Sequence, residues 1–404
     1  MSKQSSWRVW ALVSMIAVGG MLAAASGLAQ AVELGWKNHY IMQGDGQGGW
    51  VVKCAQYQIL HHPQGGGCRG FGLAQMDNGE IALVGTWSSE GTEKTVIAFS
   101  NDGGCTWSDL EQIPGLTGRP MMLAYLGNGL LTFRLGGQRY FSTDYGRTWS
   151  EHVPVPPTSD GDVFYEEGNP VVDRNAQGVA TALGEIGWHY GPSGASGYPH
   201  EACSAVFRWS YDGGRTWVDE VQPAQWHWTD TYDGKTFARG VSEGSVTRAQ
   251  NGWLVAALRT DMPARYLNQP HDDSLEGTGV SVSKDNGKTW SPIKLLFDAG
   301  RHHAHLLTMS NGDIVMTLTV RDDVRDGKLA TYRRGCDAII SHDNGLTWDL
   351  DRRYILDQYE YYDGRKWYNG ECGHVYSALL DDGSILTTQG NYKVGGISLI
   401  RWRP

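Results

Sequence analysis

Residues 142–149 read STDYGRTW, and nearly the same eight residues occur four more times in this 404-residue chain. The other copies are SNDGGCTW from Ser100, SYDGGRTW from Ser210, SKDNGKTW from Ser283 and SHDNGLTW from Ser341, all of the form Ser-x-Asp-x-Gly-x-Thr-Trp. Successive aspartates are 42 to 73 residues apart, the length of one four-stranded propeller blade with variable loops. The chain is therefore predicted to be a repeat array.

The physical chemistry of this eight-residue box is structural. Its Asp can accept backbone N–H groups across a tight turn, its Gly takes the positive-φ position, and its Trp can pack within a blade. The composition agrees, with 54 Gly, 17 Trp and 19 Tyr, and no long stretch has 3.6-residue apolar periodicity after the first thirty residues. We therefore expect an all-β fold in which the boxes need not touch a substrate.

The N-terminal segment has a different character. Lys3 and Arg8 precede a long apolar run, and Ala29-Gln30-Ala31 supplies the small residues of a cleavage site. The pattern predicts a signal peptide over residues 1–31 and a secreted, periplasmic or extracellular protein with a single propeller domain over residues 32–404. The run is nearly long enough to span a bilayer, so an uncleaved membrane anchor is the alternative.

Charge and cysteine content narrow the possible partners. The formal net charge is −10, which repels nucleic acid and anionic membranes, so we expect no nucleic-acid partner and no stable membrane insertion once the segment is cleaved. Six cysteines in an exported chain allow disulfides, and Cys54 with Cys68 would close a short loop. Buried free thiols are equally compatible with the sequence.

Five such boxes in an exported all-β chain resemble the Asp-box repeats of the sialidase superfamily, also called the BNR-repeat superfamily. The resemblance covers about residues 36–404 and implies a six-bladed β-propeller. Because other propellers also carry Asp boxes, the box indicates the architecture, and the chemistry must come from other residues.

The turn after each predicted innermost strand provides a ruler for finding those residues. Each turn contains a Gly, and the six are Gly79, Gly129, Gly178, Gly252, Gly312 and Gly383. Counting back nine or ten residues reaches the start of each strand, which should open on the axis, and finds Arg69, Arg119, Asn169, Glu243, His303 and His374. Polar groups from every blade that meet at one end are what a small-ligand site requires.

The resemblance implies a set of substrate-binding arginines. Arg69 precedes its turn Gly as the Arg of the sialidase Arg-Ile-Pro motif does, although Gly70 and Phe71 replace Ile-Pro. Glu243 and Arg259 keep the sixteen-residue spacing of the blade that carries the catalytic Glu and the second Arg, and Arg334 stands before the last box where the third Arg lies. Guanidinium groups bind a carboxylate bidentately without losing charge, so a carboxylated sugar is the expected ligand. We add Arg119 and His303 to these substrate-binding residues.

The expected catalytic residues are Tyr376, Glu243 and His374. The stretch GHVYSALLDDGSI resembles the sialidase motif that presents a nucleophilic Tyr, and Tyr376 matches it by type. His374 occupies the family position nine residues before the turn Gly and shares a strand face with Tyr376. Glu243 could accept the proton of the phenol.

The general acid stays open at this level. The loop ALVGTWSSEGTEKTV lacks the family's Asp and offers only Glu90 and Glu93; the other candidates are Glu166-Glu167 and Asp272-Asp273. RHHAH at residues 301–305 suggests a metal site, but two further ligands cannot be placed, and we expect no metal and no cofactor.

The sequence therefore predicts a secreted sialidase-like exo-glycoside hydrolase that removes a terminal carboxylated sugar, sialic acid or a related ulosonic acid, with net retention. Two alternatives remain. One is a uronate-polysaccharide lyase that moves protons with His374 or His303 and Tyr376, and the other is a glycan-binding propeller without catalysis.

Overall fold

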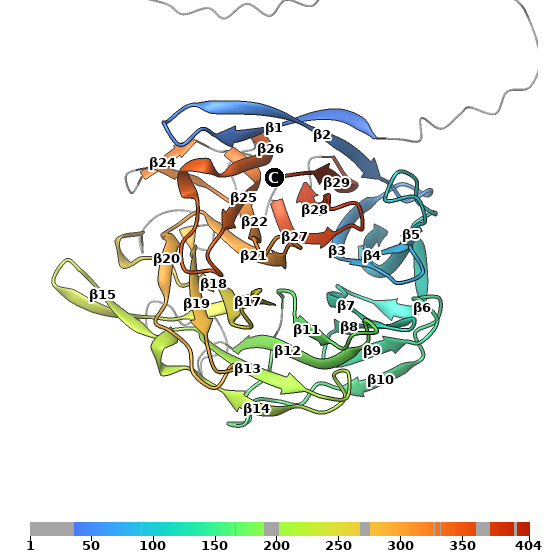
Figure 1. Cartoon of the computed structure of the whole chain (residues 1–404), viewed down its shortest axis with the longest axis horizontal. Coiled ribbons are helices and arrows are strands. Elements are labelled where there is room, and N and C mark those ends of the chain that lie inside the picture. The colour runs from blue at the N-terminus through green and yellow to red at the C-terminus, as the bar shows by residue number, and fades with distance from the viewer. Residues whose placement is uncertain are drawn as a thin grey trace, which may run out of the picture. The chain divides into compact units, whose positions relative to one another are not determined.

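The computed structural model describes residues 36–89, 91–165, 167–189, 202–266, 275–325, 328–331, 333–360, 372–391 and 394–404. The predicted signal peptide lies outside these residues. The regular secondary structure of the described residues is almost entirely β-strand, and its sheets are arranged around a central axis (Figure 1). The short 3-10 helices are η1 (Ala224–Trp226), η2 (Ala264–Tyr266) and η4 (Leu350–Arg352).

Four sheets are separate antiparallel units of four strands. In strand order they are β3 (Gly67–Gln75), β4 (Ile81–Ser89), β5 (Thr92–Ser100) and β6 (Glu111–Thr117); then β7 (Met121–Gly127), β8 (Leu130–Leu135), β9 (Gln138–Ser142) and β10 (Glu151–Pro154). The other two are β11 (Val171–Arg174), β12 (Ala180–His189), β13 (Ser204–Ser210) and β14 (Val218–Val221); then β17 (Val241–Arg248), β18 (Leu254–Thr260), β19 (Gly277–Ser283) and β20 (Lys294–Phe297).

The remaining large sheet has nine strands and contains two more four-stranded arrays. The first is β21 (Arg301–Thr308), β22 (Ile314–Val320), β25 (Arg333–Ser341) and β26 (Tyr354–Glu360). The second is β27 (Cys372–Leu379), β28 (Ile385–Asn391), β29 (Ile397–Trp402) and β2 (Trp50–Leu60), and β1 (Lys37–Gly44) pairs with both β26 and β2. Because β2 comes from the start of the domain and β29 from its end, their pairing closes the ring.

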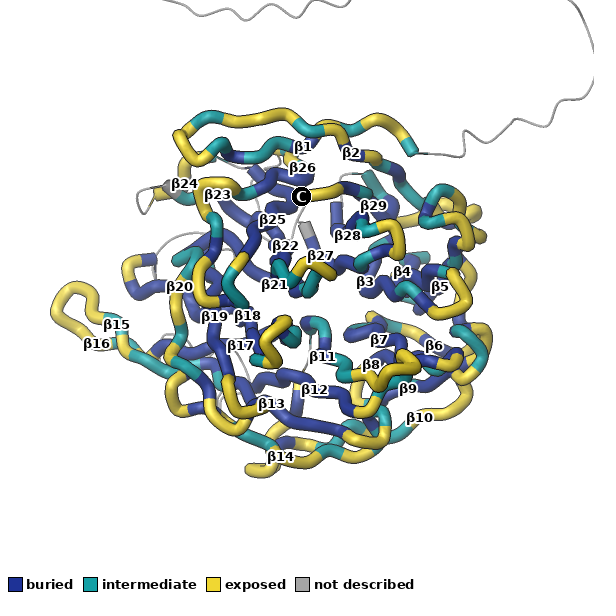
Figure 2. The backbone as a smooth tube through the Cα atoms, viewed as in Figure 1, coloured by how far each residue is buried: buried dark blue, intermediate teal, exposed yellow. Residues whose placement is uncertain are grey.

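This arrangement confirms the predicted all-β propeller with Asp-box repeats. Two hairpins lie outside the arrays: β15 (Trp228–Tyr232) with β16 (Lys235–Arg239), and β23 (Asp323–Arg325) with β24 (Lys328–Thr331). The strands nearest the axis are β3, β7, β11, β17, β21 and β27, and most of their described residues are buried except in β11 (Figure 2).

The boxes act as the sequence predicts. In the box that begins at Ser142, Asp144 Oδ1 accepts hydrogen bonds from the backbone N–H groups of Arg147 (3.0 Å) and Thr148 (2.9 Å). The indole Nε1–H of Trp149 donates to the carbonyl of Gly146 (2.9 Å). The turn is thus held by local bonds, and its tryptophan is fixed against the blade.

Neighbouring sheets pack through apolar side chains. One core cluster joins residues of β12 and β13 to residues of β17 and β18 and includes the box tryptophan Trp290, whose ring lies 5.3 Å from that of Phe207. Each interface of this kind fixes one sheet against the next, and this sets the positions of the inner strands around the axis.

Candidate functional site

Five of the six inner strands have an irregularity at the end where the candidate residues lie. The pairing register shifts at Phe71 in β3, after Met121 in β7, at Glu243 in β17, after His302 in β21 and after Cys372 in β27. A β-bulge leaves one residue out of the ladder and turns its side chain. The bulged positions include Glu243, His303 and His374, three of the residues that the turn-Gly ruler selected.

Glu243 lies at the centre of the polar cluster. Its Oε1 accepts a hydrogen bond from Arg259 Nη1 at 2.7 Å, and its Oε2 lies 2.7 Å from His303 Nδ1. All three side chains are buried. Burial alone would raise the pKa of Glu243, but the charge of Arg259, followed by the close contact with His303, holds this pKa well below the usual range.

The surroundings of His303 determine its tautomer. Its Nε2 lies 3.2 Å from Arg321 Nη2 and 3.5 Å from Arg259 Nη1, and guanidinium nitrogens only donate. Nε2 therefore accepts, which assigns the ring proton to Nδ1, 2.7 Å from Glu243 Oε2. Burial lowers the pKa of His303 to about 4, so the imidazole is neutral near pH 7. Its backbone has φ of +51°, a strained conformation that bulges and active sites often contain.

Glu167 approaches the same imidazole. Its Oε2 lies 3.6 Å from His303 Nδ1 and 3.9 Å from His374 Nδ1. Burial and the neighbouring charge of Glu243 raise the pKa of Glu167 well above its usual range. The site thus holds two carboxyl groups whose pKa values are displaced in opposite directions, an arrangement that separates an acid from an ionised carboxylate.

His374 and Tyr376 complete the cluster from β27. The hydroxyl of Tyr376 donates to the backbone carbonyl of Glu167 at 2.8 Å, and the rings of His374 and His303 are 4.5 Å apart. Burial, followed by the charge of Glu167, raises the pKa of Tyr376 well above its usual range, and burial lowers the pKa of His374. Tyr376 therefore fixes the segment that carries Glu167 and keeps its own proton.

Arg69 and Arg119 lie at the rim rather than in the buried cluster. Glu93 bridges them, with Oε1 3.2 Å from Arg69 Nη1 and Oε2 3.2 Å from Arg119 Nε. The guanidinium of Arg119 lies 6.0 Å from the ring centre of Phe71, which is 5.4 Å from that of His374. The rim is thus connected to the cluster through one aromatic side chain.

The predicted third arginine makes a different contact. Arg334 Nη1 lies 3.4 Å from Asp322 Oδ1, and both side chains are buried. Arg321, directly after β22, contacts His303 instead. Arg321 stands nine residues after its turn Gly and Arg259 seven after its own, so the two occupy the same face of corresponding strands in different sheets. This signal could have identified Arg321 from the sequence.

Glu276 is a second residue that sequence reasoning missed. It accepts a hydrogen bond from Arg259 Nε, so this guanidinium is held between Glu276 and Glu243. Burial raises the pKa of Glu276 to about 8, although the charge of Arg259 opposes this shift. No spacing rule pointed to Glu276, because it lies in a connection before β19 and outside the inner strands.

The structure describes only some of the residues that the sequence left open as candidates for the general acid. Among the acid candidates, Glu167 is in the cluster and Glu93 joins two arginines, whereas Glu90, Glu166, Asp272 and Asp273 lie outside the described residues. Asn169 bonds to Leu306 of β21 and Ser245 of β17 and so links inner strands. Cys54 and Cys68 are free thiols, so the disulfide considered for them is not formed.

Two groups of His and Glu donor atoms have metal-like spacing. Atoms of Glu167, His303 and His374, and atoms of Glu243, His302 and His303, lie within 4.8 Å of one another. Both groups need a nitrogen of His303, but Nδ1 carries the ring proton and Nε2 faces arginine donors. We therefore interpret His303 as a hydrogen-bonding residue in this arrangement.

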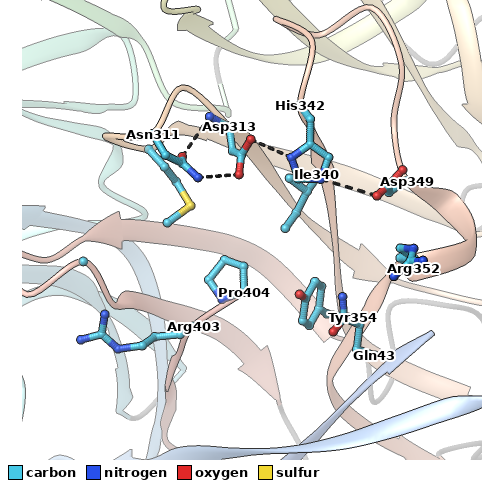
Figure 3. A pocket seen from close by; sticks show the side chains of 12 residues that line it. Gln43, Asn311, Asp313, Ile340, His342, Asp349, Arg352, Tyr354, Arg403 and Pro404 are labelled. Atoms are coloured by element: carbon cyan, nitrogen blue, oxygen red, sulfur yellow. Dashed lines mark hydrogen bonds and ion pairs between the residues drawn. The ribbon is translucent and has the colours of Figure 1, made fainter. Parts of the chain in front are cut away.

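A separate hollow of about 620 Å³ lies at the other end of β21 (Figure 3). It is lined by Asn311, Asp313, the Asp-box residue His342 and the C-terminal Pro404, and His342 Nδ1 is 2.7 Å from Asp313. None of the predicted site residues lines it.

In the part of the chain that the structure describes, no helix is both long and apolar enough for a bilayer crossing.

Comparison with known proteins agrees with this architecture. The BNR repeat-like domain family matches residues 115–386, more than half of the chain, and the chain therefore belongs to this family of Asp-box propellers. No curated protein matches the chain.

Several solved structures have the same fold. A protein of unknown function from Dyadobacter fermentans has 18% identity and a TM-score of 0.56, with 86% of this chain and 98% of that one covered. NanB sialidase from Streptococcus pneumoniae has 11% identity and a TM-score of 0.52, covering 86% and 70%. The α-L-arabinofuranosidase Arb93A from Fusarium graminearum has 12% identity and a TM-score of 0.52, covering 92% and 98%. At these identities the likeness shows the fold alone.

Proposed function

We propose that this chain is a glycoside hydrolase in which Glu167 is the general acid and Glu243 the nucleophile. The observation that carries the proposal is the approach of two carboxyl groups to one neutral imidazole, with their pKa values displaced in opposite directions. Glycosidases use such a pair, one protonated and one ionised. The similarity in fold to a sialidase and an arabinofuranosidase supports this reaction class.

The geometry favours retention of anomeric configuration. Glu243 Oε2 and Glu167 Oε2 lie 2.7 Å and 3.6 Å from the same nitrogen, so these two oxygens are at most about 6.3 Å apart, and the two carboxyl groups are near enough to share a side-chain hydrogen bond. Inverting enzymes need roughly 6.5–9.5 Å between the two carboxyl groups to hold a water molecule. In the proposed reaction Glu167 gives its proton to the leaving oxygen while Glu243 bonds to the anomeric carbon. Water, deprotonated by Glu167, then releases the sugar from Glu243.

The neighbouring residues have positioning roles in this scheme. Arg259 and His303 keep Glu243 ionised and oriented. Tyr376, predicted from the sequence as nucleophile, is assigned here to holding Glu167, since its hydroxyl already donates to the Glu167 carbonyl and its pKa is raised. His374 lies beside Glu167, and its neutral, buried imidazole forms one side of the site.

The substrate class is proposed to be a glycan with a terminal carboxylated sugar, such as a sialic acid or a related ulosonic acid. Arg69 and Arg119 at the rim are the residues we assign to the sugar carboxylate, because they are partly exposed and already share the carboxylate of Glu93. Export through the segment at residues 1–31 belongs to this proposal, since it would bring the enzyme to extracellular glycans.

A screen of 4-methylumbelliferyl sialosides, glucuronides and arabinofuranosides tests the reaction. We expect release of a carboxylated sugar, and NMR of the first product should show the same anomer as in the substrate. An inverted first product would refute the role of Glu243, and cleavage of neutral glycosides alone would refute the substrate class.

One observation favours a second candidate, a uronate-polysaccharide lyase. His303 and His374 are neutral imidazoles in a cluster with Tyr376, and such groups can move protons in β-elimination. A lyase forms an unsaturated uronate, so absorbance of the products in the ultraviolet separates the two reactions. A protein that binds these glycans and cleaves none would be the binding propeller.

A further inference from the structure

The first two sheets bring three charged residues to one end of the molecule. Arg69 is near the start of β3 and Glu93 near the start of β5, and these strands run in the same direction because each is antiparallel to β4. Arg119 precedes β7 in the next sheet. The N–H of Gly118 donates to the carbonyl of Glu93 at 2.8 Å, so the backbone holds Glu93 beside Arg119.

Glu93 uses its two oxygens as a bound carboxylate would. One oxygen faces Arg69 and the other faces Arg119, each at 3.2 Å. Two guanidinium groups thus share the carboxylate of Glu93. The side chains are 29%, 49% and 28% exposed for Arg69, Arg119 and Glu93, so the pairs are solvated and weak enough to exchange.

We propose that Glu93 occupies the position of the sugar carboxylate between Arg69 and Arg119 and thereby sets the affinity of the site for acidic sugars. An incoming carboxylate must displace Glu93 from at least one guanidinium. A neutral sugar has no group that competes with Glu93. Glu93 is therefore a specificity-determining residue, and its role rests on the proposed function in taking a glycan as the ligand.

Removal of the Glu93 charge has a defined consequence. Glu93→Gln keeps the size of the side chain, but its amide nitrogen cannot accept, so the contact with one of the two guanidinium groups is lost. Because the displaced pairs are solvated, we expect the affinity for an acidic sugar to rise about tenfold. The affinity for a neutral sugar should stay the same.

Binding can be measured on the whole chain by titration calorimetry in a Glu243→Gln background, which prevents turnover. The probes are N-acetylneuraminate, glucuronate and, as the neutral partner, glucose. Glu80→Gln is the matched control: Glu80 is also bound by an arginine, with both oxygens within 2.8 Å of Arg147 Nη2, but it lies between β3 and β4 at the opposite end. It removes the same charge away from the rim.

The expected result is tighter binding of both acidic sugars by Glu93→Gln and Glu93→Ala, no change in Glu80→Gln, and loss of binding in Arg69→Ala. Weaker binding in Glu93→Gln would show that Glu93 only orients the arginines and would overturn the proposal. Unchanged binding, or no binding of acidic sugars by any variant, would overturn it as well. Hydrolysis of glycosides by the wild-type chain is measured in a separate experiment. A negative binding result would therefore refute the role of Glu93 without refuting the proposed hydrolysis.

Discussion

Replacing Glu243 by Gln tests the proposed reaction most directly. The carboxylate accepts from Arg259 and faces the Nδ1–H of His303, so the amide can keep only one of the two interactions. The loss of one hydrogen bond to a charged group lowers the free energy of unfolding by about 1.5–3 kcal/mol. Arg259 still contacts Glu276, so the site should remain folded.

The effect on catalysis should be much larger than the effect on stability. Removal of a catalytic carboxylate lowers the rate by about 10²–10⁴-fold or more, and the initial rate of fluorogenic glycoside hydrolysis measures it. Azide should restore part of the turnover, because it can take the place of the missing nucleophile. Glu185→Gln is the matched control, since Glu185 is buried and bound by Arg139 and Arg208 but lies outside the cluster.

Guanidinium-induced unfolding should show a comparable loss of stability in both variants, and only Glu243→Gln should lose the rate. A folded Glu243→Gln variant that retains more than about a tenth of the activity would refute the assignment of Glu243.

Further predictions concern pH and stability. Activity should fall as the pH rises through the raised pKa of Glu167, because only the protonated carboxyl group can act as the general acid. A pH–rate profile of Glu167→Gln that still shows this alkaline fall would contradict the assignment of Glu167 as the acid. The pKa of Asp337 is lowered to about 2, against the effect of burial, by Arg333, Arg301 and Arg353. The ionised carboxylate therefore adds about 2 kcal/mol to the free energy of unfolding above pH 3.8, and this contribution is lost as the pH falls toward 2. Denaturant unfolding between pH 2 and pH 6 should show this dependence in the wild type and not in Asp337→Asn. Trp290→Ala should lower the free energy of unfolding by about 3–5 kcal/mol, because it empties a buried position in the core; a loss below about 1 kcal/mol would show that the box tryptophan does not hold the blades.

The fold was predictable because the Asp box is local. In all five copies the Ser hydroxyl, the Asp carboxylate, the Gly and the Trp lie within eight residues, so their hydrogen bonds do not depend on the rest of the chain. A pattern of this kind can be read directly from a sequence. The closure of the ring was less visible, since β2 and β29 come from opposite ends of the domain.

The candidate site was predictable only where it follows the inner strands. Counting back from the turn glycines found Glu243, His303 and His374, which are in contact. The same ruler could not find Glu276, which enters from a connection. Distance to an Asp box selected Arg334, whose neighbour is Asp322, because sequence spacing places a residue along a strand without giving its contacts.

The β-bulges explain why strand periodicity could not complete the site. In a regular strand His302 and His303 would point to opposite faces, yet their rings are 4.6 Å apart, because the register shifts after His302 and His303 adopts a positive φ. The same shift occurs at Glu243 and before His374. At a bulge one residue leaves the in-and-out alternation of the strand. Two consecutive side chains can then lie on the same side of the strand. The chain thus obtains a dense cluster of ionisable groups from few strands, because each bulge adds one residue to an inner strand without adding a pair to the ladder.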